Sequence, residues 1–95
     1  MPADVFAYNI VHDPNTFDEY RALVGPTALA YGGKYLVRSA PAETVEGSWV
    51  PNGLVVIEFE SEERARQWYE SPEYAAIKGL RRESATSSLI IVEGA

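Results

Sequence analysis

Two charged residues interrupt apolar stretches of the sequence and could take part in chemistry. Arg38 lies near the end of "KYLVRSA", and Glu58 lies inside "GLVVIEF". A charged side chain is costly to bury in such a stretch unless it is paired or reaches solvent. Arg38 could hold a carboxylate or an enolate, and Glu58 could act as a general base if burial raised its pKa. The structural alternative is an ion pair between the two, or exposure of Arg38 at the strand end.

His12 is the single histidine of the chain and a second candidate for proton transfer. Its side chain has an unperturbed pKa near neutrality, which suits a proton shuttle. It follows the first apolar stretch and precedes a helix start, where a side chain can line the mouth of a cavity. The alternative is an exposed loop histidine, because nothing in the sequence pairs it with a nucleophile.

Aromatic and amide side chains could complete a binding pocket. Asn9, inside the first apolar stretch, is either a ligand contact or a partner of a neighbouring backbone group. Trp49 falls in a long connection, which favours an interface or lid role. Four further aromatic residues could form a pocket wall with hydroxyls at its rim, although their spacing also fits an ordinary core: Tyr8, Tyr20, Trp68 and Tyr74.

The pair Gly32-Gly33 in "AYGGKYLVRS" invites comparison with a phosphate-binding loop. Such loops run from a strand through glycines to a helix N-terminus, which presents free amides to the anion. Here the glycines follow a helical pattern and precede a strand. A left-handed helix C-cap is therefore the role that we predict for them.

Composition limits the classes of function. The 95 residues are 46% apolar and form one domain over residues 1–95. The chain has no cysteine and one histidine, so we expect no disulfide, no metal and no cofactor. The formal charge of −6 makes nucleic acid an unfavourable partner.

Targeting and membrane signals are not recognised in the sequence. No apolar run approaches the roughly twenty residues of a membrane span, so we expect no membrane contact. We identify no secretory signal pattern and expect a cytoplasmic protein.

Alternating and helical patterns predict six elements in the order strand, helix, strand, strand, helix, strand. The strands are expected over residues 5–11, 34–40, 53–59 and 87–94. The first helix is expected to begin after Asp13, with Pro14 in its first turn, and to kink or restart near Gly25 because of Pro26. The second is expected in two segments, with Ser61 as the first N-cap and a joint at residues 71–72.

This order is typical of the ferredoxin-like α+β fold, with a four-stranded antiparallel sheet and both helices on one face. The strands over 5–11, 53–59 and 87–94 are apolar on both alternating faces. A sheet of that kind needs a cover on each face, and a second copy of the chain is the simplest one. We therefore predict a homodimer in which two sheets pack face to face as a dimeric α+β barrel.

Several motifs together resemble the domain of unknown function 1330 family, within the dimeric α+β-barrel superfamily. They are "DPNTFDEY", "YGGKYLVR", "EGSWVPNGLVVIEF", "SPEY" and the later Arg81, and they span nearly the whole chain. The resemblance implies the fold and a homodimer but no activity. The wider superfamily includes cofactor-independent monooxygenases, lactone isomerases and haem-dependent enzymes, so the fold does not decide the function.

Two functions remain open from the sequence. The first is a homodimeric enzyme or binder of a small anionic or aromatic metabolite, held between sheet and helices. Arg38 would bind the anion, and Glu58 or His12 would move a proton. The second is a non-catalytic dimeric module in which the charged strand residues are structural.

Overall fold

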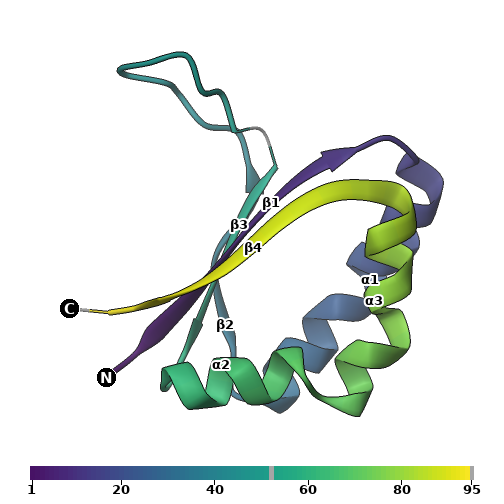
Figure 1. Cartoon of the computed structure of the whole chain (residues 1–95), viewed down its shortest axis with the longest axis vertical. Helices are drawn as coiled ribbons and strands as arrows, with labels where there is room; N and C mark the ends of the chain where they lie inside the picture. The colour runs from purple at the N-terminus through teal and green to yellow at the C-terminus, as the bar shows by residue number, and fades with distance from the viewer. Residues whose placement is uncertain (52, 95) are drawn as a thin grey trace.

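The computed structural model describes residues 1–51 and 53–94 and shows three helices on one face of a four-stranded sheet (Figure 1). The two chain ends lie together, and the Gly94 amide donates to the Pro2 carbonyl at 2.7 Å. The elements in chain order are β1 (Ala3–Val11), α1 (Pro14–Ala30), β2 (Lys34–Ala40), β3 (Leu54–Phe59), α2 (Glu62–Tyr69), α3 (Pro72–Ser84) and β4 (Ala85–Glu93).

The sheet has the strand order β2-β3-β1-β4, and every neighbouring pair is antiparallel. This order, with α1 between β1 and β2 and the other helices between β3 and β4, confirms the predicted ferredoxin-like α+β fold. Within one chain the sheet is open, with β2 and β4 at its edges. A barrel would need a second copy.

The helix ends confirm the predicted caps. The side chains of Asp13, Ser61 and Ser71 each accept a hydrogen bond from a backbone amide of the first turn. Gly32 has φ +80 and closes the C-terminus of α1, and the Gly33 amide donates to the Ala28 carbonyl at 2.8 Å. The glycine pair therefore turns the chain, as predicted.

Of the two alternatives predicted for α1 near Gly25, a kink or a restart, the restart is wrong. The helix is continuous from Pro14 to Ala30, so it does not restart near Gly25. Pro26 removes only the single bond that its amide would donate to the Ala22 carbonyl. The buried side chains of Phe17, Val24 and Ala28, on both sides of Pro26, keep the helix packed on the sheet.

The core fills the space between the helices and the inner face of the sheet. β1 and β3 contribute Val5 and Ile57, which are cross-strand neighbours, and Phe59 packs against Trp68 with ring centroids 5.5 Å apart. Tyr74 lies beside Trp68 and is fully buried. These contacts hold α2 against the sheet and α3 against α2.

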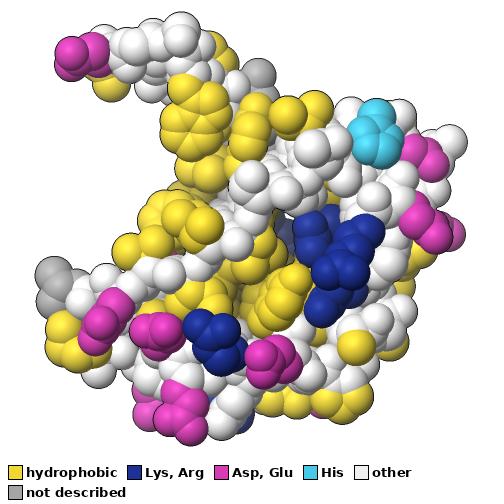
Figure 2. Space-filling model, viewed as in Figure 1, with side chains coloured by type: hydrophobic (Ala, Val, Ile, Leu, Met, Phe, Trp, Pro, Cys, Tyr) yellow, Lys and Arg dark blue, Asp and Glu magenta, His cyan; other side chains and the backbone are white. Residues whose placement is uncertain are grey.

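The outer face of the sheet carries an exposed apolar region. Phe6 and Ile90 are cross-strand neighbours on this face, and Ile90 is 56% exposed. The connection over residues 41–51, here called the arm, projects from the sheet (Figure 1), and the Trp49 ring meets the Tyr8 ring edge-on at 5.7 Å. Figure 2 shows hydrophobic side chains gathered in the hollow between the arm and the body. A groove of about 430 Å³ lies there.

Strand β2 carries two irregularities that decide which face its side chains occupy. Lys34 pairs with Glu58 on the outer face, and regular alternation would keep Arg38 on that face too. One register shift between Tyr35 and Val37 adds an extra residue, so Arg38 pairs with Val55 on the helix-covered face. A second shift lies at Ser39, which has φ +55.

Candidate functional site

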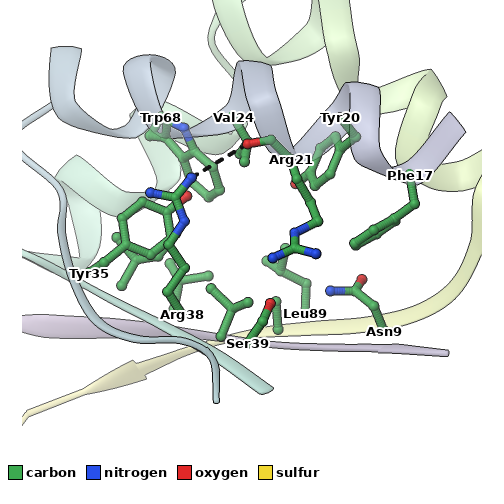
Figure 3. A pocket seen from close by; sticks show the side chains of 14 residues that line it. Asn9, Phe17, Tyr20, Arg21, Val24, Tyr35, Arg38, Ser39, Trp68 and Leu89 are labelled. Carbon is green, nitrogen blue, oxygen red and sulfur yellow. Dashed lines mark hydrogen bonds between the residues drawn. The ribbon is translucent and has the colours of Figure 1, made fainter. Parts of the chain in front are cut away.

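A pocket lies between the inner face of the sheet and α1, at the end of the sheet where β2 bulges (Figure 3). Its floor is apolar and comes from β1, β3 and β4, with Val5, Val55, Ile57 and Leu89 among its lining residues. Its cavity volume is about 40 Å³. Since one water occupies roughly 10–15 Å³ on this measure, the cavity has room for a few small groups. We call it the inner pocket.

A wider pocket of about 610 Å³ adjoins the inner pocket and opens to solvent. The two share four lining residues: Asn9, Phe17, Arg21 and Ser39. Val11, Pro14 and Val50 extend the wider pocket toward the start of α1 and the arm. A ligand could therefore place a small group in the inner pocket and its remainder in the wider one.

Arg38 forms one side of the inner pocket. Its guanidinium carbon lies 4.6 Å from the centroid of the Tyr35 ring, and Nη2 donates to the Arg21 carbonyl of α1 at 3.4 Å. A Cβ on Gly25 would lie 3.3 Å from Nη2, so the glycine leaves the space that the guanidinium uses. The side chain reaches solvent, which avoids the cost of burying its charge.

Arg21 faces Arg38 across the pocket (Figure 3). It belongs to α1, four residues after Phe17, and so lies on the helix face that carries Phe17 and Val24. Its nearest carboxylate is Asp18, at 3.9 Å, and both side chains are more than half exposed. Such an exposed pair is weak, so Arg21 remains able to bind another anion.

Asn9 and Ser39 add polar groups at the same end. The Asn9 Oδ1 accepts from the Ser87 hydroxyl at 2.6 Å, so the predicted backbone partner is instead a side chain of β4. Its amide nitrogen is then available as a donor to the pocket, into which the side chain points (Figure 3). Ser39 sits in the left-handed region, and strained residues of this kind concentrate at functional sites.

Tyr20 and Trp68 form the wall under α1 and α2. The Trp68 indole donates to the Thr27 hydroxyl at 3.0 Å, which fixes the ring. The Tyr20 hydroxyl lies 2.8 Å from that of Tyr74. Burial, and secondarily the neighbouring Tyr74, raise the pKa of the Tyr20 phenol far above its ordinary value, so it stays protonated.

A family model described as "Domain of unknown function (DUF1330)" matches residues 4–95. The chain belongs to this family. No curated protein matches the DUF1330 chain.

Solved structures share the fold of this DUF1330 protein at low identity. A protein of unknown function from Rhodopseudomonas palustris is 16% identical over 99% of this chain and 82% of its own, with a TM-score of 0.76. A dimeric ferredoxin-like protein of unknown function from Jannaschia is 12% identical over 99% and 100%, with a TM-score of 0.74. SnoaB, a cofactor-independent oxygenase from Streptomyces nogalater, is 16% identical over 99% and 93%, with a TM-score of 0.67.

Two predicted proton-transfer residues of the DUF1330 chain lie outside the pocket. Glu58 is on the outer face of the sheet, between Asp4 and Lys34 on its neighbouring strands, while Arg38 is on the inner face. The ion pair considered for Arg38 and Glu58 is therefore wrong. The two side chains also do not line the same pocket within one chain. His12 is exposed at the end of β1 and does not line either pocket.

The predicted aromatic wall is only partly assembled. Tyr20 and Trp68 line the inner pocket, and Tyr74 lies behind Tyr20. Tyr8 contacts Trp49 on the outer face and also lines the wider pocket, so it lies apart from Tyr20 and Trp68 but borders the second of the two pockets.

Sequence reasoning missed Arg21 and Ser39. An arginine at position i+4 from Phe17 and i−3 from Val24, within an apolar helical stripe, was the available signal for Arg21. Ser39 gave none, because its role depends on a bulge.

Across residues 1–51 and 53–94, no group of three acidic or histidine side chains could hold a metal ion. Within the same ranges, no helix is long and apolar enough to cross a membrane.

Proposed function

We propose that this protein binds a small organic carboxylate in the two adjoining pockets between the sheet and α1. The observation that carries the proposal is the convergence of Arg21 and Arg38 on one apolar-floored space (Figure 3). Two guanidinium groups match the planar, bidentate geometry of a carboxylate. The Asn9 amide adds a neutral donor beside them.

Local charge supports an anion despite the net charge of −6. The residues lining the inner pocket include two arginines and no carboxylate. Asp18 lines the wider pocket beside Arg21, whereas Arg38 lines the inner pocket. A low-dielectric floor strengthens the attraction between a bound anion and the guanidinium groups.

The apolar floor selects the rest of the ligand. Val5, Ile57 and Leu89 would contact a hydrocarbon or aromatic portion, and the small inner volume limits the group that enters it. A compact acid with an apolar body therefore fits better than a phosphate ester with a polar one.

We further propose that the protein is a homodimer formed through the outer face of the sheet. Several structural neighbours are named as dimeric ferredoxin-like proteins. The exposed side chains of Ile10, Ile90 and Trp49 on this side and on the arm would be covered by a second copy. The competing function is a dimer of this kind that binds no metabolite.

A thermal-shift screen separates the two functions. The protein is mixed with small carboxylates at millimolar concentration, because a ligand that binds only the folded state raises the melting temperature. We expect a hit that is lost in Arg38→Gln and kept in Arg66→Gln, a matched change at an exposed arginine of α2. No hit in the whole panel would favour the structural module.

A further inference from the structure

A buried chain of hydrogen bonds leads away from the inner pocket. The Tyr20 hydroxyl lies 2.8 Å from the Tyr74 hydroxyl, and the Arg81 Nε donates to the Tyr74 hydroxyl oxygen at 3.1 Å. Exposure is 7% for Tyr20, 0% for Tyr74 and 6% for Arg81. Of the three residues, only Tyr20 lines the inner pocket. The chain therefore connects the pocket to a buried cation.

This chain of hydrogen bonds contains one more hydroxyl hydrogen than it uses. Each tyrosine carries one hydroxyl hydrogen, and the bond between Tyr20 and Tyr74 uses one of the two. Arg81 supplies its own hydrogen to Tyr74. Within residues 1–51 and 53–94, the remaining hydroxyl hydrogen has no acceptor among the hydrogen bonds of the structure.

Burial and polarisation decide which of the two tyrosines has the hydroxyl hydrogen that is not used in the bond between them. Tyr74 accepts from a guanidinium, which makes its own hydroxyl a stronger donor toward Tyr20. Tyr74 is also fully buried, whereas Tyr20 faces a cavity. The arrangement thus leaves the Tyr20 hydrogen for an acceptor in the pocket.

The positive charge of Arg81, at the far end of the hydrogen-bond chain, also favours donation by Tyr20 into the pocket. Arg81 stays protonated in any protein environment. In the described part of the chain, the ion pairs involve Arg21 and Arg66, and no carboxylate pairs with Arg81. The buried cation polarises the Tyr74 hydroxyl, and Tyr74 in turn polarises the Tyr20 hydroxyl. The Tyr20 hydroxyl thereby becomes a stronger hydrogen-bond donor. The high pKa of Tyr20 keeps the phenol in the donor form.

We infer that Tyr20 donates a hydrogen bond to a carbonyl oxygen of the ligand, and that the pocket therefore takes oxo acids. The carboxylate would lie at Arg21 and Arg38, and the carbonyl oxygen at Tyr20. This inference rests on the proposed carboxylate binding and names the ligand class more narrowly. Arg81 and Tyr74 act as positioning residues that direct the Tyr20 hydroxyl.

The test compares acids that differ only by a carbonyl group. The purified protein is used in whichever oligomeric state it adopts. NMR titration measures its dissociation constants for two series of acids. The first series is pentanoate, 2-oxopentanoate and 4-oxopentanoate, and the second is hexanoate and 5-oxohexanoate. We expect at least one oxo acid to bind roughly threefold to tenfold more tightly than its parent, the range of one net hydrogen bond. In Tyr20→Phe this preference should disappear while the parent acid keeps its affinity.

A second variant protects the test against a folding defect. Tyr74→Phe removes the bond to Tyr20 without changing a pocket-lining residue, and it should reduce the preference for the oxo acid. A preference that persists in Tyr20→Phe, or an equal affinity for oxo acids and parents, would overturn the role of Tyr20 and leave carboxylate binding intact. Binding of none of the five acids would overturn both proposals.

Discussion

The guanidinium of Arg38 lies over the ring of Tyr35, with its carbon atom 4.6 Å from the ring centroid. The contact crosses the first bulge of β2, which brings both side chains to the inner face of the sheet. A cation held on an aromatic face loses less freedom when it binds an anion. Under the proposed function, this contact holds Arg38 in place before a ligand arrives.

Gly25→Ala should separate binding from stability. The added Cβ would lie 3.3 Å from the Arg38 Nη2, so the flexible guanidinium must move away from α1. Alanine in a helix interior is favoured over glycine by up to about 1 kcal/mol, and this gain opposes the crowding of a Cβ by the ring of Pro26, so the free energy of unfolding should change little. Carboxylate affinity should fall, as measured by titration beside chemical denaturation. Unchanged affinity would show that the position of Arg38 is not important.

Ser39→Val should destabilise the fold more than Ser39→Gly does. The residue has φ +55, a region that glycine adopts freely and a β-branched residue tolerates poorly. The valine variant should lose about 1–2 kcal/mol of unfolding free energy. The glycine variant should stay close to wild type, because relief of strain offsets its greater flexibility when unfolded. Denaturant titration of both variants tests this, and equal stabilities would argue against strain at the bulge.

Glu58→Gln should leave carboxylate binding unchanged. The side chain lies on the outer face, opposite Lys34 of β2 and Asp4 of β1, and the sheet separates it from the pocket. Loss of the cross-strand pair with Lys34 should change stability by at most about 1 kcal/mol. Isothermal titration with the acid that wild type binds provides the measurement. A large loss of affinity would place Glu58 in the site and contradict the present assignment.

Ile90→Glu should disrupt the proposed homodimer. Ile90 is 56% exposed and pairs with Phe6 on the outer face, where a charge would be buried against a second copy. Light scattering after size-exclusion chromatography should then report a monomer. Leu29→Glu, at a residue of α1 that is 67% exposed, is the matched control and should keep the wild-type mass. Dimerisation through another surface would leave the Ile90 variant dimeric.

Much of the fold could be predicted from local chemistry. The caps at Asp13, Ser61 and Ser71 and the turn at Gly32 depend on a few adjacent residues, so their signals are visible in the sequence. The two-sided apolar strands likewise indicated an outer face that is open in one chain. Only the restart predicted for α1 at Pro26 was wrong, because tertiary packing there outweighs a local helix breaker.

The candidate site was harder to predict because it depends on one inserted residue. Without the bulge between Tyr35 and Val37, Arg38 would share the outer face with Lys34 and Glu58, and an ion pair with Glu58 would be reasonable. The bulge reverses the face of Arg38 and separates the two charges. Neither propensity nor periodicity marks such a position, so Arg38 could be identified as unusual while its surroundings could not.

The most direct test of carboxylate binding is an NMR titration that follows the arginine side-chain NεH signals. The panel acid that binds wild-type protein most tightly serves as the probe. We predict that the signals of Arg21 and Arg38 shift with the same dissociation constant, that the Arg66 signal stays fixed, and that Arg38→Gln weakens binding at least roughly tenfold. Shifts confined to other arginines, or wild-type affinity in the Arg38→Gln variant, would contradict the assignment of this pocket.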